Sequence, residues 1–373
     1  MVTLDVTQPV SPEFRSAVGA AIGRFLAERS AFLREQVAPE LAALADRAAA
    51  FTAGGKRLRP AFCAWGHAAC ADSLDLPDAV LAAAASLDVL HVSALVHDDV
   101  MDASDTRRGL PAAHRQFEAD HRARGGRGEP EAFGRAGAIL LGDLLLVWSA
   151  EMFENAGLAP ATLAAAAPWL QTVRTEVTAG QYLDVLAQAV DPYTRTRTEA
   201  GVAELERLVS RVVTFKSASY TVERPLHIGA ALAGTTPERQ ATFTAYGRPL
   251  GRAFQYRDDL LGVFGDAGLT GKESGEDLRE GKLTLLAVKT FAGASDAAAR
   301  EFAALFGAAD LDAELVDRAR EIIVDSGAQA DVEAAIEREY AAALAALDVA
   351  PWLGDAARAG LANLATAAVR RAF

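Results

Sequence analysis

Cysteine and methionine are scarce in this sequence, which has 2 and 3 of them among its 373 residues. Cys63 and Cys70 lie seven residues apart on one expected helix. Two helical turns place them roughly 10 Å apart, which is too far for a disulfide. A disulfide scaffold and a zinc site built from a cysteine cluster are therefore excluded. Two reduced cysteines are typical of a cytoplasmic protein.

The sequence also lacks an excess of basic residues, because 37 Lys and Arg stand against 50 Asp and Glu, and the formal net charge is -13. This balance argues against a nucleic-acid binder. The polar segment Met1–Phe14 has no basic-then-apolar signal pattern. The most apolar run, Ala79–Val96, is interrupted by Asp88 and His91. We therefore expect a buried helix there and no stable membrane insertion.

Alternating apolar and polar residues, which are typical of β-strands, are almost absent, and alanine and leucine recur at helical spacing. We expect a single all-α domain over residues 1–373, a bundle of about 10–13 helices with its core at 15–370. A segment rich in glycine and charge predicts a mobile loop at 120–135. The expected helices span 12–46, 59–70, 77–105, 133–155, 160–187, 199–218, 222–233, 237–264, 281–292, 295–306, 310–325, 328–346 and 351–371.

Carboxylates are concentrated in two places that lie 160 residues apart. In the first, Asp98 and Asp102 share one helix face, and His91 lies on the same stripe. Like charges this close repel each other, so the pattern favours a bound cation. Arg107 and Arg108 follow, and guanidinium groups suit phosphate oxygens. The alternatives are a solvated helix end with Asp–Arg pairs and, for His91 alone, a core histidine.

The second concentration is the pair Asp258 and Asp259, which follows Gln255 on another apolar helix. Lys272 and Lys282 come next, on glycine-containing loops where ammonium groups suit a phosphate. Taken alone, these two lysines are better explained as surface residues on a turn.

A basic segment, Gly54–Pro60, places three cations after a pair of glycines. It is not a Walker A loop, because Ala50 stands where that motif has glycine and Lys56 is followed by Arg57. A phosphate site at the start of a helix is the remaining functional interpretation.

In their order, these segments resemble the motifs of the trans-isoprenyl diphosphate synthase (polyprenyl synthetase) family, over roughly residues 15–370. Six matches in sequence order are far more specific than any one of them. They are Gly54–Pro60, Asp98-Asp99-x-x-Asp102 with Arg107-Arg108-Gly109, Gly180-Gln181-x-x-Asp184, Lys216-Ser217, Phe254-Gln255-x-x-Asp258-Asp259, and the later Lys272 and Lys282. The resemblance implies the isoprenoid synthase fold with a central apolar cavity, a homodimer, and head-to-tail condensation of isopentenyl diphosphate with an allylic diphosphate.

The resemblance also implies roles for the matching residues. Three Mg²⁺ ions would be bound, two by Asp98 and Asp102 with Asp99 nearby, and one by Asp258 with Asp259 and Gln255 in support. The allylic diphosphate would be bound by Arg107, Lys216, Ser217, Lys272 and Lys282. Isopentenyl diphosphate would be bound by Lys56, Arg59, His91 and Arg108. Within these sets the catalytic residues would be Lys216, Arg107, Asp98, Asp102 and Asp258.

The residues depart from the family pattern at two positions. Gly262 replaces the last aspartate of the second motif, and Asp266, one turn further, is the candidate substitute. Ser217 stands where threonine is usual, which keeps the hydroxyl.

Product length is expected to depend on the stripe that precedes Asp98. Bulky aromatics four and five residues before the first motif stop growth at fifteen carbons in the family, whereas this chain has Ala94 and Ser93. Leu90 and Leu87, further along that face, would set a deeper floor. We expect geranylgeranyl diphosphate, with a longer product second and farnesyl diphosphate third.

Three other functions fit parts of the sequence. A class I terpene cyclase would lack Lys56 and Arg59, and a non-catalytic subunit of a synthase would be expected to lose aspartates that this chain keeps. A di-iron protein would need a second Glu-x-x-His pair beside Glu118 and His121, and two more carboxylates.

Overall fold

The computed structural model describes residues 1–107, 109–265, 275–308 and 310–370, and 79% of it is helical. This confirms the all-α prediction. The elements in chain order are β1 (Val2–Thr3), α1 (Pro12–Phe32), η1 (Leu33–Val37), η2 (Pro39–Leu41), α2 (Ala42–Thr52), α3 (Leu58–Ala71), β2 (Asp75–Leu76), α4 (Asp78–Met101), β3 (Thr106–Arg107), β4 (Leu110–Pro111), α5 (Ala113–Ala123), α6 (Pro130–Glu154), α7 (Pro160–Gln188), α8 (Pro192–Arg195), α9 (Glu199–Val212), η3 (Val213–Glu223), α10 (Arg224–Ala233), α11 (Pro237–Phe264), α13 (Glu276–Arg279), α14 (Leu285–Gly293), α15 (Asp296–Leu305), α16 (Ala313–Asp325), α17 (Ala328–Asp348) and α18 (Asp355–Val369).

The chain forms two compact units. Unit 1 consists of Met1–Ala167, Pro225–Thr236 and Gly354–Leu364, and unit 2 consists of Pro168–Arg224, Pro237–Leu353 and Ala365–Phe373. The single domain expected from the sequence stays a prediction.

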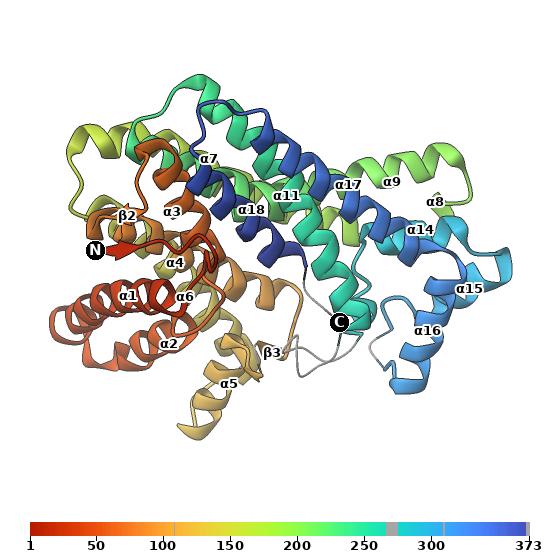
Figure 1. The fold of residues 1–373 in the computed structure, drawn as a ribbon. Helices are drawn as coiled ribbons and strands as arrows, with labels where there is room; N and C mark the ends of the chain where they lie inside the picture. The colour runs from red at the N-terminus through yellow and green to blue at the C-terminus, as the bar shows by residue number, and fades with distance from the viewer. Residues whose placement is uncertain (108, 266–274, 309, 371–373) are drawn as a thin grey trace. The chain divides into compact units, whose positions relative to one another are not determined.

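Helix α4 is the central helix of unit 1, where it packs along α6 and also contacts α1 and α3 (Figure 1). Both α4 and α6 are long and apolar enough to cross a membrane by length and composition. The most apolar stretch of α4 is 72% buried inside the protein, and that of α6 is 44% buried. Helix α4 is therefore a mostly buried core helix, as the sequence predicted.

Helix α11 is the central helix of unit 2 and packs against α17 and η3 (Figure 1). The approach of η3 is close: a Cβ added at Gly251 would lie 2.5 Å from the Cα of Ala218. Only glycine leaves room for a backbone at this distance. The segment η3 is an 11-residue π-helix, and π-helical turns are rare and frequent at functional sites.

Two sequence expectations are corrected by the structure. The helix expected over 12–46 is broken at Pro39, because proline has no N–H and forces Ala38 into an extended conformation (φ -165°). The loop expected at 120–135 is shorter, since α5 includes residues 120–123 and α6 begins at Pro130. Polar and charged residues outnumber apolar ones in α5, which is why a helix was not expected there.

Candidate active site

The first carboxylate cluster lies at the C-terminal end of α4. Asp98 is in the last turn and Asp102 follows the last helical residue, with its N–H donating to the carbonyl of Asp98 at 2.8 Å. Ala103 then has a φ of 54°, a left-handed conformation that is uncommon for a residue with a Cβ and is concentrated at functional sites. Carboxylates are unfavourable at a helix C-terminus because the helix dipole is negative there. A bound cation would offset this cost.

Arg107 is held beside this cluster by a short hairpin of β3 and β4. Its Nε donates to Asp99 Oδ1 at 2.7 Å, and its Nη2 lies 3.9 Å from Asp98 Oδ2. Asp99 is 1% exposed and has Arg107 as its ion-pair partner, so the structure shows it orienting a guanidinium. Its predicted part in metal binding stays a prediction. Arg108 lies outside the described residues.

The basic segment begins α3 and faces α4 within the same unit. Lys56 is exposed, Arg59 is half-buried, and His91 is half-buried on α4. Arg57 is buried and ion-paired with Asp88 of α4. The structure therefore brings Gly54–Pro60 to the helix that also carries the first carboxylate cluster.

The predicted chain-length residues divide over two environments along α4. Leu87 and Leu90 are 2% exposed, and Ala94 is half-buried on the same side as His91 and Asp98. Ser93 is buried and donates to the carbonyl of Gly142 on α6 at 2.7 Å. Ser93 therefore packs between two helices of unit 1.

Lys216 belongs to η3 in unit 2, and its Nζ donates to Asp184 Oδ2 of α7 at 2.6 Å. Asp184 is 2% exposed, whereas Ser217 is half-buried. Gly180 lies one turn before Asp184 in the Gly180-Gln181-x-x-Asp184 motif and faces the backbone of η3. A Cβ at residue 180 would lie 2.3 Å from the backbone nitrogen of Lys216, so glycine lets η3 approach α7 closely enough for the ion pair.

The second carboxylate cluster lies in the C-terminal half of α11. Asp259 is 3% exposed and accepts a hydrogen bond from Nε2 of Gln255 at 2.7 Å, while Asp258 is half-buried. Burial raises the pKa of Asp259 to about 7, against the lowering effect of Lys282. Asp259 therefore holds its proton more tightly than an exposed aspartate does, and a cation bound nearby would favour its ionised form.

Asp277 is the functional candidate that sequence reasoning missed. A Cβ at Gly262 would lie 2.2 Å from Asp277 Oδ2, so the carboxylate of Asp277 fills the space beside the position where the second motif lacks its last aspartate. Asp277 is 6% exposed on α13, and its Oδ1 lies 3.9 Å from Lys282 Nζ. Asp266, the substitute expected from the sequence, and Lys272 lie outside the described residues. The only signal in the sequence was that Asp277 stands between two predicted lysine ligands.

These residues fit magnesium. Mg²⁺ takes one or two carboxylates from a protein and completes its octahedron with phosphate oxygens and water, and Asp98, Asp102 and Asp258 offer carboxylates of this kind. Among the described residues, no group of three or more His, Cys, Asp and Glu side chains is arranged to hold a metal ion. A structural zinc site would require a full protein ligand set.

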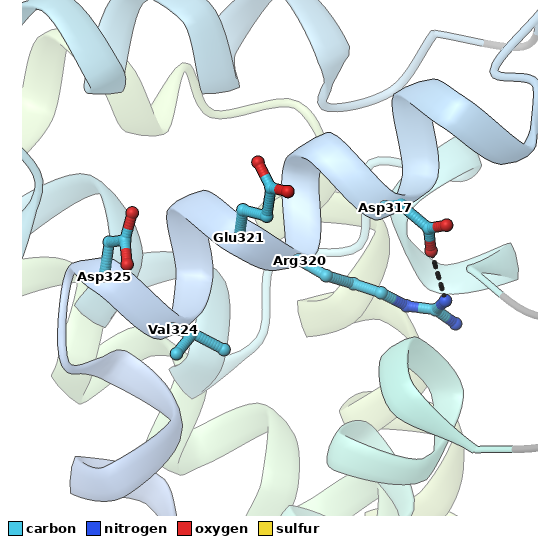
Figure 2. Close-up of a pocket in the computed structure, with 5 residues that line it drawn as sticks. All are labelled: Asp317, Arg320, Glu321, Val324 and Asp325. Carbon is cyan, nitrogen blue, oxygen red and sulfur yellow. Dashed lines mark hydrogen bonds and ion pairs between the residues drawn. The ribbon is translucent and has the colours of Figure 1, made fainter.

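Two other polar features do not form a site. Glu118 pairs with Arg115 and Arg122, and His121 lies 3.1 Å from the carbonyl of Arg127, which leaves no di-iron arrangement. Figure 2 shows an open surface hollow on α16 whose lining residues are Asp317, Arg320, Glu321, Val324 and Asp325. Its arginine is already bonded to Asp317 and to the carbonyl of Val263, so the hollow has the character of a solvated helix face.

Comparison with known proteins identifies the family of the chain. The Polyprenyl synthetase family profile matches residues 42–323. The geranylgeranyl diphosphate synthase of Methanosarcina mazei is 34% identical over 239 residues, which are 64% of this chain and 64% of that enzyme, so the match spans just under two thirds of its length. The geranylfarnesyl diphosphate synthase of Aeropyrum pernix is 33% identical, over 74% of this chain and 77% of that enzyme.

Solved structures include a still more similar protein. The geranylgeranyl pyrophosphate synthase of Corynebacterium glutamicum, solved with isoprenyl diphosphate and magnesium, has a TM-score of 0.88 and 38% identity, and the match covers 99% of this chain and 100% of that one. The fold is therefore the isoprenoid synthase fold. The chain belongs to the polyprenyl synthetase family, whose enzymes are prenyltransferases.

Proposed function

We propose that this chain condenses isopentenyl diphosphate with an allylic diphosphate in a Mg²⁺-dependent reaction and releases geranylgeranyl diphosphate. The observation that carries the proposal is the arrangement along α4. A carboxylate cluster ends this helix, and a basic segment is anchored at Asp88, ten residues earlier. Ten residues of helix span roughly 15 Å, which gives room for two diphosphate groups, one bound through metal and one through cations alone.

The residues that the sequence singled out are assigned to this reaction. Asp98 and Asp102 bind Mg²⁺, and Arg107, oriented by Asp99, binds the allylic diphosphate. Lys56, Arg59, His91 and Arg108 bind isopentenyl diphosphate. Asp258 binds a third ion with Asp259 and Gln255 in support, and Lys216, Ser217, Lys272 and Lys282 bind the allylic diphosphate.

Asp277 is the candidate for the carboxylate that the second motif lacks at Gly262. Its carboxylate lies where the missing one would begin, and it is buried beside Lys282. We propose that Asp277 replaces the last carboxylate of that motif. The second cluster then has as many carboxylates as the family motif, although Asp277 comes from α13 and not from α11.

The chemistry follows from these charges. Breaking the allylic C–O bond leaves diphosphate and an allylic cation, and Arg107 and Lys216 stabilise the negative charge that grows on the leaving group. Bound Mg²⁺ supplies Lewis-acid stabilisation of the same oxygens. The double bond of isopentenyl diphosphate attacks the cation, and the released diphosphate accepts the proton that leaves. This assigns no protein side chain as general base.

The product assignment rests on the small side chain of Ala94, which puts no bulky group on the face of α4 one turn before Asp98. The relatives reported above make geranylgeranyl and geranylfarnesyl diphosphates, so a longer product is the second candidate and farnesyl diphosphate the third. A class I cyclase is disfavoured because Lys56 and Arg59 are present.

A homodimer in the cytoplasm completes the proposal. Helix α6 exposes Leu140 and Val147 at 61% and 62%, and apolar side chains seven residues apart on one face suit a second copy of the chain. Light scattering of the purified protein would give twice the chain mass of 39.2 kDa.

The test is incubation with isopentenyl diphosphate, each allylic primer and Mg²⁺, followed by chromatography of the dephosphorylated products. We expect a twenty-carbon alcohol, and none when EDTA removes the metal. A cyclic hydrocarbon from a linear diphosphate would favour the cyclase. Absence of any condensation product would refute the synthase assignment.

A further inference from the structure

Arg57 lies between two of the proposed phosphate-binding cations but is buried where they are not. Lys56 is exposed and Arg59 is half-buried, whereas Arg57 is 5% exposed. Its Nη1 donates to the carboxylate of Asp88, and its Nη2 donates to the carbonyl of Thr52 at 2.8 Å. Arg57 lies in the segment proposed to bind phosphate, but its guanidinium is bonded to acceptors of the protein itself.

The two acceptors belong to different helices of unit 1. Thr52 is the last residue of α2, and Asp88 lies in the middle of α4, one helical turn before His91. Arg57 itself occupies the position immediately before the first residue of α3. One guanidinium therefore joins the end of α2, the start of α3 and the turn of α4 that leads to His91.

This arrangement is costly. Arg57 has a φ of 54°, in the left-handed region that residues with a Cβ rarely adopt. The side chains of Arg57 and Asp88 are 4% and 5% exposed, so both charges have lost most of their water. A buried ion pair of this kind contributes little net stability, and its best-attested use is to fix one arrangement among several.

We propose that Arg57 and Asp88 are positioning residues whose ion pair holds Lys56 and Arg59 in register with His91. The pair acts on the binding of isopentenyl diphosphate and leaves the breaking of the allylic C–O bond unaffected. The inference rests on the proposed function, because that function assigns Lys56, Arg59 and His91 to one diphosphate.

The test compares two substrates in one enzyme. Asp88→Asn keeps the size of the side chain and removes its charge, and Arg57→Lys keeps the charge and loses the two-acceptor geometry. In both variants we expect the KM for isopentenyl diphosphate to rise about tenfold, while kcat and the KM for the allylic diphosphate stay within about twofold. Calorimetric titration with isopentenyl diphosphate alone should show the same weakening.

Asp120→Asn is the matched control. Asp120 pairs with Arg47 and joins α5 to α2 in the same unit, away from the basic segment. We expect both KM values of this variant to match those of the wild type. Equal losses in the control and in Asp88→Asn would mean that any broken ion pair has this effect, and would overturn the proposal.

Thermal unfolding separates positioning from folding. If Asp88→Asn does not fold, Arg57→Lys decides, because it keeps the buried charge paired. A folded Arg57→Lys variant with wild-type affinity for isopentenyl diphosphate overturns the proposal, and so does a loss of kcat that follows the unfolded fraction. Failure of the wild type to condense its substrates would count against the proposed function, whereas a normal wild type with insensitive variants counts against Arg57 and Asp88 alone.

Discussion

The two carboxylate clusters carry similar residues but are assembled in different ways. The first lies at the end of α4, where the side chain of Asp98 is 20% exposed and its neighbours come from the same helix and the hairpin after it. The second lies within α11, where Asp259 is 3% exposed and a further carboxylate comes from α13. All carboxylates of the first cluster come from one short segment of the sequence, so their spacing reveals them. The second cluster includes Asp277 from a separate element, which the spacing within α11 does not reveal.

The two clusters also differ in what makes a cation favourable. At the end of α4, exposed carbonyl groups and carboxylates repel each other. Inside α11, burial raises the pKa of Asp259, and a cation would restore its ionised form. We therefore expect the first cluster to bind metal together with the substrate. We expect metal binding at the second cluster to depend on the residues packed around Asp259.

Replacing Asp98 with asparagine breaks the first cluster and has the largest expected effect. It removes one of two carboxylates that share a metal, so the leaving group loses stabilisation, and kcat/KM should fall on the order of 10³-fold. Steady-state condensation assays over a range of Mg²⁺ concentrations measure it. Asp46→Asn is the control, since Asp46 is an exposed carboxylate in α2 of the same unit. A loss below tenfold in Asp98→Asn would contradict the assignment.

Exchanging the residues at 262 and 277 tests the second cluster. Asp277→Gly should lower kcat about 10²-fold and raise the Mg²⁺ concentration needed for half-maximal rate, because the buried cluster loses one carboxylate. Gly262→Asp alone should also fail, since its Cβ would lie 2.2 Å from Asp277 Oδ2 and like charges would meet.

The double variant, Gly262→Asp with Asp277→Gly, returns a carboxylate to the helix position and removes that clash. We expect it to recover at least tenfold over Asp277→Gly. Wild-type activity and Mg²⁺ dependence in Asp277→Gly would show that this carboxylate has no part in the reaction.

Gly180→Ala asks whether close backbone packing positions the residues of unit 2. The new Cβ would meet the backbone of Lys216 at 2.3 Å, so η3 must shift and the Lys216–Asp184 pair must loosen. We expect roughly a tenfold lower kcat and about 1–3 kcal/mol lower stability. Chemical denaturation and steady-state assays measure the two effects.

Gly23→Ala provides the matched control. It is a helical glycine of α1 with nothing within 4 Å of the added Cβ, and alanine there should raise stability by up to about 1 kcal/mol. If Gly180→Ala behaves in the same way, the distance between α7 and η3 does not control Lys216.

Local patterns account for what the sequence predicted correctly. Helical spacing of apolar residues predicted α3, α4, α7 and α11 to within a few residues. The same method missed α5, which is highly charged, and the break at Pro39. The spacing of Asp98 and Asp102 placed both at the C-terminal end of α4, and their role in metal binding stays a prediction.

Tertiary contacts account for what the sequence did not show. The sequence could not reveal that Asp277 lies against Gly262, that Arg57 is buried on Asp88, or that Gly180 admits η3, since each of these contacts joins separate elements. Ser93, predicted as a chain-length residue from its position alone, makes a hydrogen bond to α6 that depends on the packing of two helices.

Ala94→Phe tests whether the growing chain lies along the face of α4 that leads to the first cluster. It should change the length of the product more than the rate. Ala94 lies one turn before Asp98 on the half-buried side of α4, so an aromatic ring there should obstruct the growing chain and shorten the product by one or two isoprene units. We expect kcat for the first condensation within about threefold of the wild type, because no charged group is lost. Ala79→Phe is the control, as a half-buried alanine near the start of the same helix, and its product should be unchanged. Chromatography of the dephosphorylated products compares the two, and equal product lengths in both variants would refute the placement of the chain along this face of α4.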